Sequence, residues 1–356
     1  MSPYVYIVPV FFLMIAAEHI LSRARGIELY RFQDTVTSIN AGLVSQFVNV
    51  MGSAFSVYMY SLMVTQFGAF SWSTSEIWVW IVALVLYDFC YYWVHRAGHE
   101  VNLFWASHVV HHSSEDFNLA TALRQSATGF YFKWAFYLPL AVLGIPTQVF
   151  VVVALIDLLY QYWVHTQLIG RLGILERFLV TPSNHRVHHG QNEYCIDRNY
   201  GGIFSIWDRI FGTYADERAD ERVIYGVRKP LHSWDPVWAN FHHYFVIGRL
   251  VRSAQPWREK FVHVFGPPRG PLHLGAIGEQ PFVTGDFVPF ATPYTSRMKL
   301  VGGISTVFGT AMLMWLYVID EQLGLIQNLV YSAMMLGFFS FIGRLWMRPE
   351  MMGTLR

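Results

Sequence analysis

The sequence predicts an all-α integral membrane protein, built as a multi-span helical bundle with a helical cap. Its composition is the first observation: of 356 residues, 54% are hydrophobic and 14% are charged, whereas soluble proteins carry about 25% charged residues. The second observation is that several apolar runs reach the roughly 20 residues that a helix needs to cross a bilayer. The net charge of +1, without a long basic tract, gives no indication of a nucleic-acid partner.

The first half of the chain supplies three apolar runs, and each predicts one span. The first run, 3–21, is followed by Arg23 and Arg25. Since a cleaved signal peptide carries its basic residues in front, this run is predicted to stay as an anchor or first span. The second run covers 40–64. The third run covers 77–94 and ends directly at His95.

The remaining runs predict two helical hairpins. Gly144 and Pro146 interrupt the long run 129–164, so this run is predicted to turn and return to the side that it left. It then delivers His165 to that side. The runs 301–318 and 325–342 form the second hairpin at the end of the chain.

Basic residues predict the orientation of these spans, because they accumulate on the cytoplasmic side. The connections 66–76, 144–147 and 319–324 contain no Lys or Arg, so they are predicted to lie outside. Lys133 lies near the inner end of its helix, from which its side chain can reach the interface. The predicted organisation is therefore transmembrane helices in 1–165, a cytoplasmic cap in 166–299 and a C-terminal transmembrane hairpin in 300–356.

Nine of the fifteen histidines follow the spacing of metal ligands. In helices, residues separated by three or four positions share a face, and these histidines occur as one pair at that spacing, two triplets and a single residue. The predicted organisation places all of them on the cytoplasmic side. They are His95 and His99; His108, His111 and His112; His165; and His185, His188 and His189.

Imidazole ligands suit zinc, copper, iron or nickel, so the histidines predict a transition-metal site without naming the metal. The other six histidines, among them His19 and His242, are interpreted as surface or hydrogen-bonded residues. Cys90 and Cys195 lie far apart, which argues against a disulfide framework or an iron–sulfur cluster. The segment 215–222, a repeated Ala-Asp-Glu-Arg, is predicted as a solvated surface helix.

Carboxylates commonly orient metal-bound histidines from behind, and the sequence offers five candidates near the ligands. Asp88 lies seven residues before His95, on the same helical face, and an acid in a span is costly enough to suggest a purpose. The five candidates are Asp88, Glu100, Glu115, Asp116 and Asp197.

The histidine pattern on a membrane scaffold resembles the fatty acid hydroxylase and sterol desaturase superfamily. Longer strings resemble its alkylglycerol monooxygenase branch more closely, over roughly residues 30–265. In that branch a Glu follows the first histidine pair, as Glu100 does here. The strings are 95–100 (HRAGHE), 105–119 (WASHVVHHSSEDFNL), 121–126 (TALRQS), 181–190 (TPSNHRVHHG), 207–213 (WDRIFGT), 223–226 (VIYG) and 241–243 (FHH).

The resemblance implies two iron ions held by the nine histidines, oxygen as a substrate and a tetrahydropterin as the electron donor. It implies hydroxylation of the carbon beside the ether oxygen of an alkylglycerol, after which the product collapses to a fatty aldehyde and a glycerol. The membrane lipid would be the partner. The pterin is implied by the resemblance alone, and its binding residues are unknown from the sequence.

Two other functions remain open at the level of sequence. One is a hydroxylase or desaturase of a sterol, fatty acyl chain or carotenoid, reduced by an external redox protein; no flavin, nicotinamide or haem-domain motif is visible in the chain, so electrons are expected from outside. The other is a membrane metal transporter or haem electron carrier. A transporter places ligands along a path across the bilayer, whereas these histidines are predicted on one face. The oligomeric state is not predicted.

Overall fold

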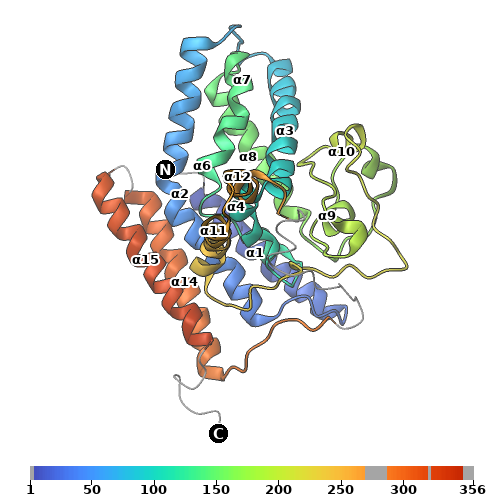
Figure 1. The fold of residues 1–356 in the computed structure, drawn as a ribbon, viewed down its shortest axis with the longest axis vertical. Helices are drawn as coiled ribbons and strands as arrows, with labels where there is room; N and C mark the ends of the chain where they lie inside the picture. Colours follow the sequence, from blue (N-terminus) through green and yellow to red (C-terminus); the bar gives the residue numbers. More distant parts are fainter. Residues whose placement is uncertain (1–3, 269–286, 320–321, 348–356) are drawn as a thin grey trace.

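The protein is described here from a computed structural model, which covers residues 4–268, 287–319 and 322–347. The described chain is mainly helical (Figure 1), and its long helices are α1 (Tyr4–Ala24), α2 (Phe32–Phe67), α3 (Ile77–Glu100), α14 (Ser296–Ile319) and α15 (Leu325–Trp346).

Four of these helices, α1, α3, α14 and α15, are long and apolar enough to cross a membrane. Their positions agree with the predicted runs 3–21, 77–94, 301–318 and 325–342. The helix α2 is bent by 51° between its parts 32–49 and 54–67, and the pair would make a fifth span. The run 40–64 therefore belongs to one longer, bent helix.

The predicted hairpin of 129–164 is present, with a broken first arm. That arm consists of α6 (Phe130–Lys133), the 3-10 turn η1 (Trp134–Tyr137) and α7 (Leu138–Val142), and the second arm is α8 (Thr147–Trp163). Gly144 adopts a φ of +83° at the tip, where a Cβ atom would lie 2.0 Å from the carbonyl oxygen of Phe70. Only glycine fits there, because both the backbone conformation and the close contact exclude a side chain.

The hairpin tip and the connection between α2 and α3 lie at the same end of the molecule, at the top of Figure 1. The amide of Ala69 donates to the carbonyl of Val142 over 2.8 Å, and the Trp72 indole donates to Leu143 over 2.6 Å. These contacts place the connections 66–76 and 144–147 on one side, as the sequence predicts.

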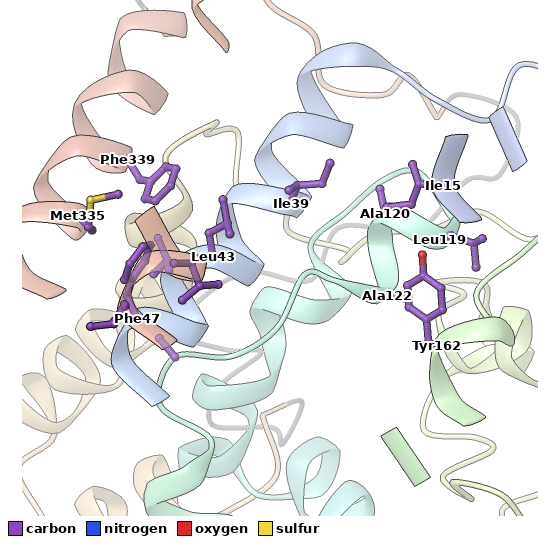
Figure 2. Packing of buried hydrophobic residues seen from close by; sticks show 14 residues of the cluster. Ile15, Ile39, Leu43, Phe47, Leu119, Ala120, Ala122, Tyr162, Met335 and Phe339 are labelled. Atoms are coloured by element: carbon purple, nitrogen blue, oxygen red, sulfur yellow. The ribbon is translucent and has the colours of Figure 1, made fainter. Parts of the chain in front are cut away.

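A buried apolar cluster joins the first and last helices to the middle of the chain (Figure 2). Ile15 of α1, Phe47 of α2, Tyr162 of α8 and Phe339 of α15 belong to it. Leu119, Ala120 and Ala122 of the short helix α5 (Leu119–Ala122) also belong to it, beside Ile15 and Tyr162. Because Phe117 and Asn118 precede α5 directly, this core also holds the segment that follows the second histidine group.

The described part of the region 166–299 contains helices joined by extended segments. Before α14 begins at Ser296, the helical elements described there are η2 (Gly173–Arg177), α9 (Pro182–His188), η3 (Glu193–Cys195), α10 (Ile206–Ile210), α11 (Pro236–Ser253) and α12 (Trp257–Phe265). The helices α9 and α10 lie beside α3 at the right of Figure 1, whereas α11 packs against α2, α4 (Asn102–His112) and α15.

The surface helix predicted for 215–222 is wrong, because the structure has no helix there. Instead, Glu217 forms an ion pair with Arg186 of α9 at 2.7 Å. Glu221 accepts a hydrogen bond from Asn192 over 2.7 Å. These side chains hold the segment against the residues around His185, His188 and His189. Such contacts outweigh the helix propensity of Ala, Glu and Arg.

Candidate metal centre

Four separate elements bring the nine histidines together. His95 and His99 lie in the last two turns of α3, and the first triplet, 108–112, occupies the last turns of α4. His165 follows the end of α8 by two residues. The second triplet, 185–189, lies on α9 and its C-cap, His189.

The start of α9 is fixed by its own sequence. Pro182 occupies the first helical position, where its missing N–H costs nothing. Thr181 and Asn184 form a reciprocal capping box, in which the Thr181 amide donates to the Asn184 side chain over 3.1 Å. Since a short helix is marginal by itself, these caps set where His185, His188 and His189 begin their turn.

The histidines form two buried groups rather than one. Within each group the candidate ligand nitrogens all lie within 4.8 Å of one another. The first group has five members, His95, His99, His108, His112 and His188; the second has four, His111, His165, His185 and His189. Each of the nine predicted ligands thus belongs to one of the two groups, and each of the two triplets contributes to both groups.

The nitrogen spacings fit metal coordination. The Nε2 atom of His108 lies 3.1 Å from Nε2 of His95 and 3.1 Å from Nε2 of His112. In the second group, Nε2 of His165 lies 3.3 Å from that of His111 and 3.0 Å from that of His185. Two imidazoles bound to one ion at about 2.0–2.1 Å in adjacent positions have their nitrogens about 3 Å apart.

The far side of four rings is held by backbone carbonyls. The Nδ1 atom of His95 lies 2.9 Å from the carbonyl of Tyr200, and that of His188 lies 2.9 Å from the carbonyl of Arg198. His111 pairs in the same way with Arg124 and His165 with Gln161, at 3.0 and 2.7 Å. Because a carbonyl only accepts, Nδ1 carries the proton and Nε2 keeps its lone pair for a metal.

Burial keeps these rings in the neutral form that binds metal. It lowers the pKa of His188 to about 4 and that of His165 to about 3. The Nε2 atoms of His188 and His189 are buried without a hydrogen-bond partner among the described residues. Unpaired buried nitrogens are costly, and a bound ion would satisfy them, so the residues present fit two transition-metal ions.

Asp88 has a different position from the one expected. Its carboxylate accepts from the amides of Ile203 and Phe204 at 2.6 and 3.1 Å, and from the Trp207 indole at 2.9 Å. Asp88 therefore anchors the segment before α10 to α3, and none of its hydrogen bonds among the described residues goes to an imidazole.

The other candidate carboxylates divide in two. Glu100, Glu115 and Asp116 lie in ion pairs with arginines: Glu100 with Arg96 at 2.9 Å, and the other two with Arg31 at 3.7 and 2.6 Å. Asp197 is the candidate nearest a ligand, because its carboxylate lies 3.9 Å from Nδ1 of His99.

Sequence reasoning missed one positioning residue, Asp208. It is fully buried, and it accepts from the amides of Tyr200 and Gly201 at 2.7 and 2.8 Å and from the Thr213 hydroxyl at 2.7 Å. Tyr200 in turn supplies the carbonyl behind His95. Asp208 and Thr213 both lie in the string 207–213, which resembles the family, so the sequence marked them as residues of interest. Nothing in the string indicates that Asp208 bonds to the amide of Tyr200.

A cavity opens beside the first group. Tyr91, His95, His108 and Lys133 line it together with aromatic side chains from α4, α6 and η1. Tyr91 thus lines a cavity next to the candidate ligands, whereas its neighbour Tyr92 is buried and shares a hydrogen bond with Thr213 at 3.0 Å.

Comparison with known proteins agrees with this geometry. Residues 80–213, which include all nine histidines, match the family model described as fatty acid hydroxylase. The chain is also similar to alkylglycerol monooxygenases over most of its own length.

Two of these relatives are animal proteins. Alkylglycerol monooxygenase of Homo sapiens is 44% identical over 273 residues, which are 76% of this chain and 61% of the relative. That of Xenopus tropicalis is 42% identical over 295 residues, which are 82% and 66% of the two chains. A bacterial protein, the ornithine lipid hydroxylase OlsE of Rhizobium tropici, is 31% identical over 38% of this chain and 41% of its own.

The chain thus spans less than two thirds of the length of the alkylglycerol monooxygenases that it matches. No solved structure matches it.

Proposed function

We propose that this protein is a di-iron membrane monooxygenase that cleaves the O-alkyl bond of an alkylglycerol. One observation carries the proposal: two adjacent buried groups of imidazoles lie in a chain that is 44% identical to a human alkylglycerol monooxygenase. The five residues of the first group would hold one iron and the four of the second group the other. When bound, the iron pair supplies activation of O2.

The overall reaction balances with a two-electron donor. Oxygen, the ether lipid and two reducing equivalents with two protons give water and a lipid hydroxylated on the carbon beside the ether oxygen. That product is a hemiacetal, so its C–O bond breaks to leave a fatty aldehyde and a glycerol. As the resemblance to the alkylglycerol monooxygenase branch implies, we propose a tetrahydropterin as the donor, with binding residues that are not assigned.

The chain's own residues would control position and water. The carbonyls behind His95, His111, His165 and His188 fix the ring orientations, so the ligand nitrogens are in place before a metal binds. The aromatic side chains around the small cavity beside His95 and His108 would keep water out of the site and contact an alkyl chain that approaches it. Because a strong oxidant attacks the nearest carbon, this placement would decide which C–H bond reacts.

The orientation and organisation are part of the proposal. The connections 66–76 and 144–147, which contain no Lys or Arg, lie at one end of the molecule (Figure 1), and the histidine groups lie away from that end. By the distribution of basic residues, the histidine side would face the cytoplasm. The membrane helices would then be those of 1–165, which carry His95, His99 and the first triplet. The cap would be 166–299, which carries the second triplet, and 300–356 would form a terminal hairpin.

The test is direct product analysis. Purified protein loaded with iron is expected to consume O2 and release a fatty aldehyde from 1-O-dodecylglycerol when a tetrahydropterin is supplied. Replacing His188 with Ala is expected to remove that activity, by at least 100-fold, and to lower the iron content, whereas His242→Ala, on α11 outside both groups, leaves both unchanged.

Turnover of sterols or acyl chains with a ferredoxin, and of no ether lipid, would establish the alternative hydroxylase or desaturase. Metal binding without oxygen consumption on any lipid would favour the transporter or electron carrier instead.

A further inference from the structure

Two short elements of the predicted cap leave large apolar side chains exposed. Ile174 and Leu175 belong to η2, Phe178 follows η2 directly, and Ile210 is the last residue of α10. Each of the four residues is between 49% and 68% exposed. Single exposed apolar residues are normal, whereas several together mark an interaction surface. We call these four residues the η2–α10 surface.

Hydrogen bonds hold η2 and α10 side by side. The Ser205 hydroxyl and the Arg209 side chain both donate to the carbonyl of Glu176, over 2.9 and 3.1 Å. The amide of Ser205 also donates to the carbonyl of Phe178 over 3.0 Å. Because these bonds join residues next to the exposed apolar side chains, the two elements share one surface.

The α10 end of this surface lies beside a candidate membrane span, α3 (Figure 1). The ring of Phe211, the residue after α10, lies 5.0 Å from that of Trp93, and the ring of Trp207 lies 5.0 Å from that of Phe89. Phe89 follows Ile77, the first residue of α3, by twelve positions, which is about 18 Å along a helix. A hydrocarbon core that begins near Ile77 and is about 30 Å thick would therefore still surround α10.

Backbone polar groups at membrane depth must be paired within the protein, and the segment that leads into α10 is bonded accordingly. The amides of Ile203 and Phe204 donate to Asp88 of α3 over 2.6 and 3.1 Å. The carbonyl of Ile203 accepts from the amide of Val180 over 2.8 Å. A carboxylate inside the span thus holds the backbone of a cap segment, which places that segment at the level of the span.

The exposed charges of η2 and α10 are positive. The acids of the two elements, Glu176 and Asp208, are buried, whereas Arg177 and Arg209 are exposed. Apolar side chains next to arginines fit the boundary between acyl chains and phospholipid phosphates. A second copy of the chain fits less well, because a two-fold contact through the same surface would bring its arginines together.

We propose that the η2–α10 surface is immersed in the membrane leaflet on the histidine side, with its four apolar side chains among acyl chains and Arg177 and Arg209 at phospholipid phosphates. The predicted cap is then not purely aqueous, because one of its faces is a membrane surface. The contact also supports the candidate metal centre. Asp208 of α10 accepts from the amide of Tyr200 over 2.7 Å, and the Tyr200 carbonyl lies 2.9 Å from Nδ1 of His95.

The test measures the depth of single fluorescent labels in the full-length protein. Leu175→Cys, Ile210→Cys and Arg177→Cys variants are labelled with NBD and reconstituted into vesicles of phosphatidylcholine and phosphatidylglycerol. The natural thiols Cys90 and Cys195 are buried, so the new cysteine is the main target. The quenchers are iodide in water, phosphatidylcholine with a nitroxide on its acyl chain, and phosphatidylcholine with a nitroxide on its headgroup.

Two exposed positions provide matched controls. Ile81→Cys lies on the candidate span α3 and reports contact with lipid, whereas Asp220→Cys lies in the segment 215–222 of the cap and reports contact with water. Metal content and the thermal unfolding midpoint verify that each labelled variant folds.

The labels at Leu175 and Ile210 are expected to behave like the label at Ile81, with quenching by the acyl-chain nitroxide and at least fivefold weaker quenching by iodide than at Asp220. The label at Arg177 should be quenched more by the headgroup nitroxide than by the acyl-chain nitroxide, and the opposite order would overturn the phosphate contact. Iodide quenching at Leu175 and Ile210 equal to that at Asp220 would overturn the proposal. Protection from iodide and from both lipids would overturn it as well, because another copy or another part of the chain would then cover the surface.

Discussion

At the scale of single residues, the support behind the candidate ligands comes from the backbone. Carboxylates near the histidines were the natural expectation, but His95, His111, His165 and His188 point Nδ1 at carbonyls. Every residue has a carbonyl, so no residue type in the sequence marks those partners. The ligands themselves could be predicted because, among the residue types that bind metal, histidines repeat here at helical spacing.

Asp88 and Glu100 lie on the same helix, α3, and provide a matched pair of carboxylates: Asp88 anchors another segment, whereas Glu100 forms an ion pair at the surface. Asp88→Asn replaces one carboxylate oxygen by an amide NH2 group, which then faces one or two of the three existing donors, at a site with 0% exposure. We expect a loss of about 1–3 kcal/mol of stability, measured as a lower unfolding midpoint. Glu100→Gln removes a partly exposed ion pair, worth about 0–1 kcal/mol, so its midpoint should hardly move. Equal effects would contradict the anchoring role of Asp88.

At the scale of elements, the triplet His185, His188 and His189 depends on a close approach of the segment that follows it to α3 and α8. A Cβ atom on Gly202 would lie 2.6 Å from a carboxylate oxygen of Asp157 and 2.7 Å from one of Asp88. Asp88 lies in α3, one of the candidate membrane spans, and Asp157 lies in the shorter apolar helix α8. The glycine lets the backbone pass against both helices. The requirement for glycine could not be read from the sequence, because it comes from residues 45 or more positions away.

Gly202→Ala should therefore push this segment off the helices. We expect about 1–3 kcal/mol of destabilisation, as in other overpacked sites, together with a lower iron content, because Tyr200 would shift from His95. Gly170→Ala is the control, since a Cβ atom there meets nothing within 4 Å. Iron analysis and thermal unfolding of the two variants make the comparison, and unchanged metal content in Gly202→Ala would show that the segment can move without affecting the ligands.

At the scale of the whole molecule, the distribution of basic residues predicts which end faces the cytoplasm. Two exposed residues belong to opposite predicted sides. Ser75 lies between α2 and α3, and Asp220 lies in the segment that packs beside His185, His188 and His189. The natural thiols Cys90 and Cys195 are buried, so a new cysteine at either position is the main target for a membrane-impermeant reagent.

In intact cells Ser75→Cys should be labelled, and Asp220→Cys should be labelled only after permeabilisation. The reverse pattern would place the histidine groups outside and contradict the proposed orientation. Both cysteines labelled in intact cells would mean that the predicted topology is wrong.

The long apolar helices, the glycine turn of the hairpin and all nine candidate ligands could be predicted from the sequence, because hydropathy and helical spacing are local properties of the chain. The division of the ligands into groups of five and four, the carbonyls that orient four of the rings and the cavity beside the first group became visible only in the folded chain. Those facts depend on helices that are distant in sequence, since each triplet contributes to both groups and a ring's environment is set by whichever segment packs behind it.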